Sequence, residues 1–142
     1  MRFDHFDVTQ RVKKQYTQAV EPVCRKWNLT KNELDVLLFL HNNPEYDRAA
    51  DIVVHRGMTK SHVSLSVTNL ESRSLLQRRE DPEDRRAVRL ILSEEGRTIA
   101  EEGREYQIRF FGALFEGLSR EELLQLQNLM ERIRRNIDRI EG

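Results

Sequence analysis

The chain has 142 residues, 38% of them hydrophobic and 34% charged, and its 24 Lys and Arg residues balance 24 Asp and Glu residues. This length fits one domain, and the composition is typical of a soluble, helix-rich protein. No apolar run approaches the roughly 18 residues of a membrane span, residues 1–10 lack the apolar core of a secretory signal, and a single cysteine excludes a disulfide framework. We therefore expect a cytoplasmic protein with no membrane partner.

A first helix is predicted over residues 6–26. Its apolar side chains recur at helical spacing and form one stripe, made of Val12, Tyr16, Ala19 and Val23. Pro22 lies inside this pattern, and because proline removes a backbone hydrogen bond it usually kinks or ends a helix. We expect the stretch 24–28 to bend toward the next element.

A capping box begins the second predicted helix. Thr30 is followed three residues later by Glu33, an arrangement in which each side chain satisfies a backbone N–H group of the other residue. The residues from Leu34 to Leu40 are apolar nearly all round the helix, which indicates burial on more than one side. The turn Asn42-Asn43-Pro44 ends this helix.

A short helix and a longer one follow. Asp47 is expected to cap the short helix, which runs through His55 and ends at Gly57. Its packing residues are expected to be Ala49, Ala50, Ile52 and Val53. Together with the longer helix that Thr59 is expected to cap by accepting a backbone N–H, it forms a predicted helix-turn-helix pair.

The Thr59 helix has two different faces. Val63, Val67 and Leu70 form a stripe that is expected to be buried. The other face is small and hydroxylic, and it carries Ser61, His62, Ser64, Ser66, Thr68 and Asn69. These side chains both donate and accept hydrogen bonds, and most are short enough to let a helix approach the wall of a groove.

A hairpin is predicted next. Leu76–Glu80 and Ala87–Leu92 alternate apolar and charged residues as two half-buried strands, and the turn Asp81-Pro82-Glu83-Asp84 joins them. Arg85 and Arg86 lie just past that turn. Two arginines at the tip of a hairpin suit contacts to phosphates and to a narrow minor groove.

Two C-terminal helices complete the chain. Ser93 caps a long helix to about Phe115, Gly117 breaks it, and Ser119 with Glu122 forms a second capping box. The last helix then carries an apolar seam at alternating steps of three and four residues, formed by Leu123, Leu126, Met130, Ile133, Ile137 and Ile140. This seam is too short for an isolated coiled coil, so we interpret it as one helix of an intertwined homodimer interface.

The order of these segments resembles the MarR family of winged helix-turn-helix transcriptional regulators. The family's wing has an Asp, any residue and an Arg, then a strand ending in Leu-Ser/Thr-x-x-Gly. Asp84-Arg85-Arg86 and Leu92-Ser93-Glu94-Glu95-Gly96 match this pattern. Leu29-Thr30, Gly57-Met58-Thr59-Lys60-Ser61 and Leu70-Glu71 stand at the corresponding positions before it.

The resemblance implies a mainly α fold with a small β-hairpin wing. The whole chain, residues 1–142, would form a single domain. Its winged helix-turn-helix lobe would cover about 29–96, and its dimerisation helices about 1–28 and 97–142. The resemblance is strongest from Leu29 to Gly96 and rests on helical character outside that stretch.

The resemblance also implies that the partner is a double-stranded DNA operator. The expected contacts are Lys60, Ser61, His62, Ser64, Leu65, Thr68, Asn69, Arg85 and Arg86. Arg86 matches the wing arginine and is assigned to the minor groove, Arg85 to phosphate, and Asp84 to holding the turn by accepting hydrogen bonds and pairing with a nearby arginine. Many members have an arginine where this chain has Leu65, which cannot form a bidentate contact with guanine but can pack on a thymine methyl.

A formal net charge of zero argues at first against nucleic acid, because phosphate binding usually calls for a basic domain. Basic residues nevertheless outnumber acidic ones in residues 59–92, and the acidic excess lies mainly elsewhere. The chain is therefore expected to depend on dimer formation for affinity. The predicted function is repression of a pseudo-palindromic operator until a small-molecule effector releases the protein, and the alternative is a dimeric helical interaction module without DNA binding.

Relatives often bind small aromatic or phenolic acids between the dimer helices and the winged lobe. The candidates for such a wall are Tyr16, Trp27, Phe39, Phe110 and Phe111, although aromatic residues at helical spacing are more often core residues. Some relatives sense peroxide through a cysteine of the first helix, but Cys24 is displaced from that position and is interpreted as a packed or incidental thiol.

Catalysis and metal binding are not expected. The chain has no G-x-S-x-G elbow, no P-loop and no paired-carboxylate motif in a credible context. Its histidines, His5, His41, His55 and His62, form no metal-ligand spacing. We therefore expect neither an enzyme nor a cofactor.

Overall fold

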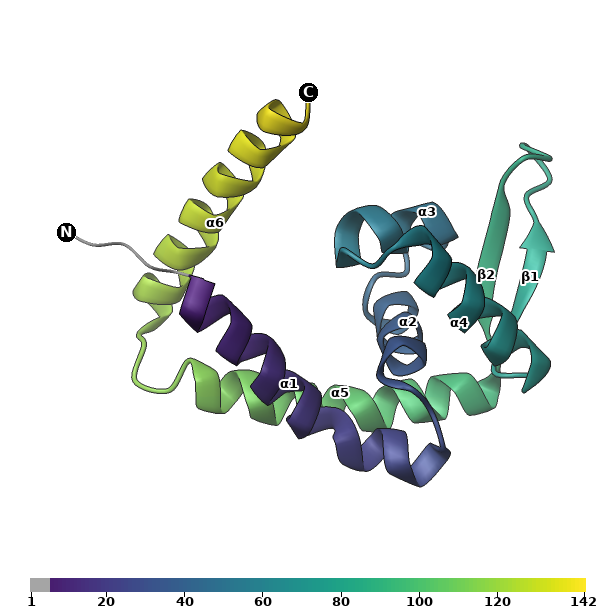
Figure 1. The fold of residues 1–142 in the computed structure, drawn as a ribbon, viewed down its shortest axis with the longest axis horizontal. Coiled ribbons are helices and arrows are strands. Elements are labelled where there is room, and N and C mark those ends of the chain that lie inside the picture. The colour runs from purple at the N-terminus through teal and green to yellow at the C-terminus, as the bar shows by residue number, and fades with distance from the viewer. Residues whose placement is uncertain (1–5) are drawn as a thin grey trace. The chain divides into compact units, whose positions relative to one another are not determined.

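The computed structural model describes residues 6–142 and is mainly helical, with one antiparallel hairpin (Figure 1). The chain divides into two compact units, an N-terminal unit that runs to Ile108 and a C-terminal unit from Arg109 to Gly142. The predicted fold class is confirmed. Within the described part, no helix is both long and apolar enough to cross a membrane.

Helix α1 covers Phe6–Trp27, so the predicted first helix is confirmed. Pro22 lies inside it without ending it. The helix ends instead at Asn28, whose φ of 52° is in the left-handed region that asparagine tolerates, and Leu29 N–H donates to the carbonyl of Cys24 at 2.8 Å. This ending sets the direction in which the chain enters the next helix.

Helix α2, Lys31–Asn42, forms the centre of the N-terminal unit. The capping box is confirmed, because Glu33 N–H donates to Thr30 Oγ1 at 3.1 Å and Thr30 N–H donates to Glu33 Oε1 at 2.9 Å. All residues from Glu33 to Leu40 are buried, which confirms burial on more than one side. The carboxylate of Asp35 is buried among them, and Lys31 and Arg56 balance its charge.

The short third helix differs from its prediction. It consists of an α-helical turn, α3 (Ala49–Asp51), and a π-helical turn, η1 (Ile52–Arg56), which ends at Gly57 with a φ of 75°. Asp47 is not the cap, because its carboxylate accepts from Arg89 Nε at 2.6 Å, while Asp51 Oδ2 accepts the backbone N–H of Arg48 at 3.1 Å. The charge-assisted hydrogen bond from Arg89, which lies on a distant strand, outweighs the preference of Asp47 for capping the adjacent helix.

The predicted packing residues of this helix are only partly right. Ile52 is fully buried and Val53 is half-buried, but Ala49 and Ala50 are exposed. The helical segment is too short to bury a full apolar stripe, so the two alanines remain at the surface of the N-terminal unit.

Helix α4 covers Lys60–Ser72, and Thr59 Oγ1 accepts the N–H of His62 at 3.1 Å as predicted. The buried stripe of Val63, Val67 and Leu70 is confirmed. Ser66 was wrongly placed on the polar face, since it is only 4% exposed. Residue 66 lies three positions after Val63 and four before Leu70, so helical periodicity places it on the buried side.

Strands β1 (Leu76–Glu80) and β2 (Val88–Leu92) pair antiparallel, with Leu76 opposite Leu92 and Glu80 opposite Val88. The strands and the connecting residues 81–87 are called the wing hereafter. The second strand begins one residue later than predicted. In β1 only Leu76 is buried, so the expected alternation is wrong for this strand, because most of the wing extends away from the core.

Helices α5 (Glu94–Leu114) and α6 (Arg120–Glu141) confirm the predicted C-terminal pair. Ser93 Oγ accepts the N–H of Gly96 at 3.0 Å, and Ser119 and Glu122 form the expected reciprocal capping box at 3.1 and 2.8 Å. Gly117, with a φ of 86°, takes the left-handed conformation between the two helices. Apart from half-buried Leu123, the seam residues of α6 are exposed in the single chain.

Candidate nucleic-acid interface

The N-terminal half of α4 presents an exposed polar surface. Lys60, Ser61, His62, Ser64 and Leu65 are all exposed there. This end of the helix also carries the positive end of the helix dipole, which favours an anionic partner. The first half of α4 is therefore available to a ligand as large as a nucleic acid.

Further along α4, two of the expected contact residues have partners within the fold. Thr68 Oγ1 accepts from Arg78 Nη2 at 3.1 Å, and Asn69 Nδ2 donates to Glu33 Oε2 at 3.1 Å. Both side chains remain exposed. They tie the helix to the wing and to α2 respectively, and they fix the angle at which α4 is presented.

Arg73 anchors the C-terminal end of α4 and was not singled out in the sequence. Its guanidinium donates to the carbonyl oxygens of Trp27 at 2.7 Å and Asn28 at 2.8 Å, where α1 ends. The left-handed turn at Asn28 exposes these carbonyls, and no sequence pattern linked them to an arginine far along the chain.

Two aspartates hold the backbone of the wing tip. Asp84 Oδ1 accepts the N–H of Arg86 at 3.0 Å, and Asp81 Oδ1 accepts the N–H of Glu83 at 3.0 Å. The Glu83 N–H, followed by the charge of Arg48, lowers the pKa of Asp81 below its ordinary value. Within residues 6–142, the arginine ion pair at this tip is Arg48 with Asp81, at 3.2 Å, whereas a partner for Asp84 was expected.

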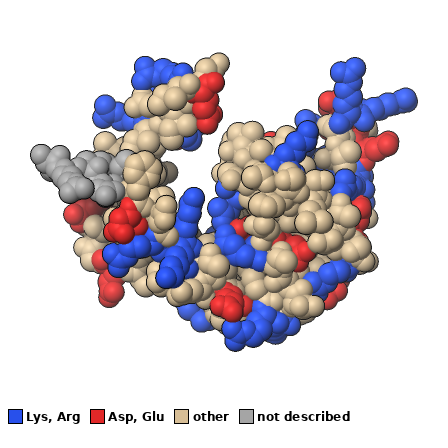
Figure 2. Space-filling model, in the orientation of Figure 1, with Lys and Arg blue, Asp and Glu red and all other residues tan. Residues whose placement is uncertain are grey.

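The wing carries more positive charge than its own carboxylates neutralise. Arg79 stands directly opposite Arg89 in the strand register, a like-charge pairing that is unfavourable without counterions. Asp47 compensates Arg89, but no carboxylate of residues 6–142 pairs with Arg79, Arg85 or Arg86. Figure 2 shows Lys and Arg side chains projecting from the end of the wing. Such a surface favours phosphate oxygens.

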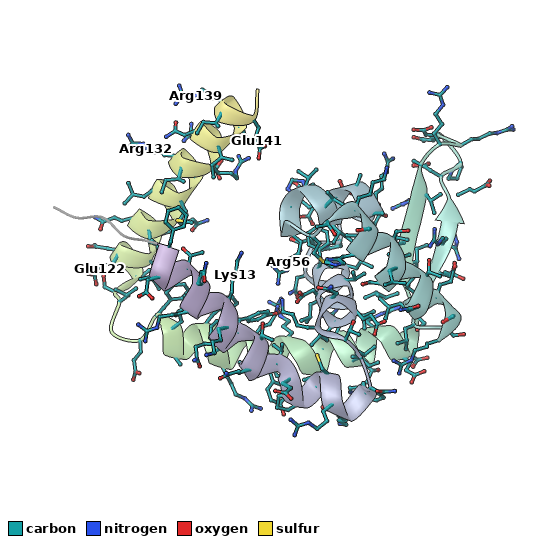
Figure 3. All side chains as sticks on the ribbon, in the orientation of Figure 1. Lys13, Arg56, Glu122, Arg132, Arg139 and Glu141 are labelled. Atoms are coloured by element: carbon teal, nitrogen blue, oxygen red, sulfur yellow. The ribbon has the colours of Figure 1, made fainter. Side chains whose placement is uncertain are left out.

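A buried ionic cluster connects the helix-turn-helix pair to α1 and α2. Asp35 accepts from Lys31 Nζ at 2.5 Å and pairs with Arg56 Nη2 at 3.2 Å. Arg56, labelled in Figure 3, is the last residue of η1. Both cations lie over the ring of Tyr16, whose hydroxyl accepts from Gln107 Nε2 at 2.7 Å. A buried charge is costly without partners, so this cluster fixes η1 against α1, α2 and α5.

The aromatic residues proposed for an effector wall have separate partners. Trp27 Nε1 donates to Glu102 Oε2 at 2.9 Å, Tyr16 belongs to the ionic cluster, and Phe39 stacks on Tyr46. Phe110 and Phe111 lie in the C-terminal unit and contact each other edge to face, with ring centroids 5.3 Å apart. An effector wall made of these residues stays a prediction.

The histidines do not gather with other ligand-type residues. His55 stacks on Tyr46 with centroids 4.1 Å apart, and His62 is exposed on α4. Across residues 6–142, no group of three His, Cys, Asp or Glu side chains is arranged to hold a metal ion. His5 lies outside the described residues.

Cys24 is half-buried on α1. Burial, followed by the nearby carboxylate of Asp35, raises the pKa of its thiol, which lowers the thiolate fraction at neutral pH. Cys24→Ser should therefore leave DNA binding and its response to peroxide unchanged. Gel shifts with and without hydrogen peroxide check this, and peroxide-triggered release in the parent but not in the variant would contradict it.

A helix-turn-helix pair followed by an arginine-bearing hairpin defines the class, a winged helix-turn-helix protein. A sequence profile of the MarR family matches residues 27–87. The chain is 27% identical over 114 residues to the uncharacterized HTH-type transcriptional regulator YdgJ of Bacillus subtilis (strain 168), covering 80% of this chain and 69% of the relative.

Solved structures agree with this assignment. S. aureus MepR in its DNA-binding conformation has a TM-score of 0.84, and its DNA complex has 0.75, each at 20% identity over 95% of this chain and 99% of MepR. CouR from Rhodococcus jostii RHA1, bound to p-coumaroyl-CoA, has a TM-score of 0.77 at 25% identity over 92% of this chain and 91% of CouR. The chain is thus similar to the MarR family in sequence over residues 27–87, and it shares the fold of solved regulators of that family.

Proposed function

We propose that the protein regulates transcription by binding a pseudo-palindromic DNA operator as a homodimer. The observation that carries this proposal is the group of wing arginines, Arg79, Arg85 and Arg86, that have no carboxylate partner among residues 6–142 and lie next to the exposed polar face of α4. The helix supplies hydrogen-bonding groups for base edges, and the wing supplies cations for the phosphates and the minor groove. In the solved MepR–DNA complex, a protein of this fold is bound to DNA.

The exposed seam of α6 supports the dimer. Met130, Ile133 and Ile137 are exposed large apolar residues on one stripe of this helix. A stripe of this kind is rarely left in water by a stable monomer, so a second copy is the occupant we propose. The pair would present two α4 helices about one DNA turn, roughly 34–36 Å, apart.

We further propose that the dimer represses transcription until a small aromatic or phenolic effector releases it. The bound p-coumaroyl-CoA of CouR supports an organic effector of this kind. The ionic cluster of Asp35 and Arg56 joins the helix-turn-helix pair to α1 and α2, so a shift of those helices would be transmitted to α4.

Arg86→Ala is the variant that tests DNA binding by the wing. It should weaken operator binding by on the order of 1–3 kcal/mol per contact and lower the magnitude of the salt slope. Thermal stability should barely change, because Arg86 is exposed at the wing tip. Fluorescence anisotropy with promoter DNA from the protein's own locus measures both the affinity and the salt slope. The titration covers about 50 to 200 mM salt, a range in which phosphate contacts lose much of their contribution to affinity.

Arg25→Ala is the matched control, since it removes the same charge from an exposed position on α1 where Arg25 pairs only locally with Glu21. It should leave the salt slope nearly unchanged. If Arg86→Ala binds operator with the affinity and salt slope of the parent, the wing does not contact DNA. That result would favour the alternative of an interaction module without DNA binding. Substitution of Ser64 should instead change which base pairs are preferred.

A further inference from the structure

Leu65 is an apolar side chain in the middle of the exposed face of α4. It is 62% exposed, whereas every other exposed residue of this helix is polar or charged. Leu65 lies two positions after Val63 and two before Val67, and because an α-helix turns by about 100° per residue, it points away from this buried stripe. A single exposed leucine is ordinary on a protein surface. This one, however, lies at the centre of the face that would enter the major groove.

The side chains one turn away on either side leave Leu65 uncovered. Thr68 accepts a hydrogen bond from the wing and Asn69 donates one to α2, so both are held within the fold. Ser61, one turn earlier, is exposed and has a short side chain. A ligand that covers this face of α4 must therefore cover Leu65 as well.

The chemistry of the major groove limits what can lie against a leucine. Guanine and adenine present the acceptor N7 there, together with O6 of guanine or the amino group of adenine, whereas thymine presents the methyl group on C5. A leucine side chain over the purine groups would remove them from water without offering a hydrogen bond, which is costly. Against the thymine methyl, both apolar surfaces leave water, which is favourable.

We propose that Leu65 reads the C5-methyl group of a thymine in each half-site of the operator. Because Leu65 meets a base only if α4 enters the major groove, this assignment rests on the proposed function. A T·A pair is then preferred at the position that faces Leu65, and guanine on the same strand is disfavoured. The same methyl group is present on 5-methylcytosine, so methylation of a C·G pair at this position would also be felt by Leu65.

The test replaces thymine by deoxyuridine, which lacks only the C5-methyl group, at one position at a time in promoter DNA from the protein's own locus. Fluorescence anisotropy compares the full-length parent with Leu65→Ala and Leu65→Met. At one thymine of each half-site, the replacement should weaken binding by the parent about fourfold, the scale for one methyl group removed from an apolar contact. The same replacement should leave the affinity of Leu65→Ala unchanged, and it should weaken Leu65→Met nearly as much as the parent.

A second arm supplies the methyl group on another base. The thymine found in the first arm is changed to cytosine or to 5-methylcytosine, each paired with guanine. The parent should bind the methylated duplex about fourfold more tightly than the unmethylated one, and Leu65→Ala should not distinguish the two.

The variants should fold as the parent does, because Leu65 is exposed and the buried stripe of α4 is unchanged. Leu65→Val, which shortens the side chain less, replaces Leu65→Ala if the latter binds too weakly to titrate. Equal responses of the parent and the shortened variant to the methyl group, in either arm, would overturn the assignment while leaving operator binding intact. Failure of the parent to bind DNA at all would contradict the proposed function, and the assignment with it.

Discussion

Gly96→Ala should lower the free energy of unfolding by about 3 kcal/mol or more. A β-carbon at this position would lie 2.1 Å from the carbonyl oxygen of Leu75, far inside any van der Waals contact. The neighbouring backbone cannot easily yield, because the same carbonyl accepts the N–H of Ser93 at 3.0 Å and Leu75 is buried. The clash would push the start of α5 away from the base of the wing.

Gly103→Ala is the matched control on the same helix. Its new β-carbon would lie 3.1 Å from a terminal methyl of Leu38, a side-chain end that can move by a few tenths of an ångström. The net change should be within about 1 kcal/mol of zero, because the helix propensity of alanine offsets the cost of moving this methyl, and it should be well below the cost of Gly96→Ala. Urea unfolding of both variants, followed by circular dichroism, compares them, and equal stability of the two would show that Gly96 does not pack against Leu75.

Ile133→Glu should convert the protein to a monomer and weaken operator binding by at least about a hundredfold. Ile133 is half exposed in the single chain and lies on the α6 seam with Met130 and Ile137, so a carboxylate there would be buried only when two copies associate. An unpaired charge at the centre of an apolar interface is strongly destabilising. Loss of the partner also removes the second half-site contact.

Sedimentation velocity at micromolar concentration measures the conversion to a monomer, and fluorescence anisotropy with operator DNA measures the loss of affinity. Asn128→Glu, an exposed position of α6 outside the seam, is the control and should remain dimeric. A parent protein that sediments as a folded monomer, or an Ile133→Glu variant that remains a dimer, would contradict the assignment of this seam.

Local signals in the sequence were sufficient for most of the architecture. The capping boxes at Thr30 and Ser119 and the cap at Thr59 each predicted a helix start that the structure confirms. These signals succeed because a capping side chain bonds to backbone groups only a few residues away. The hairpin was predicted for a similar reason, since its strands are separated by a short polar turn.

Features that depend on distant partners could not be predicted in the same way. Asp47 had the local chemistry of a cap, but Arg89 on β2 takes its carboxylate. Asp35 interrupted an apolar helix without indicating that Arg56 would reach it from η1. Ser66 was predicted to lie on the polar face because its neighbours are polar, although the helical period places it on the buried side.

In the candidate interface, too, features set by nearby residues could be predicted and features set by distant residues could not. The exposure of Arg85 and Arg86 follows from their place at a hairpin tip, where little can cover them. The anchoring of α4 by Arg73 and the unfavourable register of Arg79 opposite Arg89 required the tertiary structure. The apolar pocket lined by the short third helix, α4 and the wing could not be predicted either, because it forms where these elements meet and none of them fills the space.

The most direct test of DNA-binding regulation is a salt titration of the parent protein with two duplexes. One carries promoter DNA from the protein's own locus, and the other has the same composition in shuffled order. We expect tighter binding to the promoter duplex, two chains per site, and an affinity that falls linearly with salt on a logarithmic scale. Equal, weak and salt-independent binding to both duplexes would contradict it.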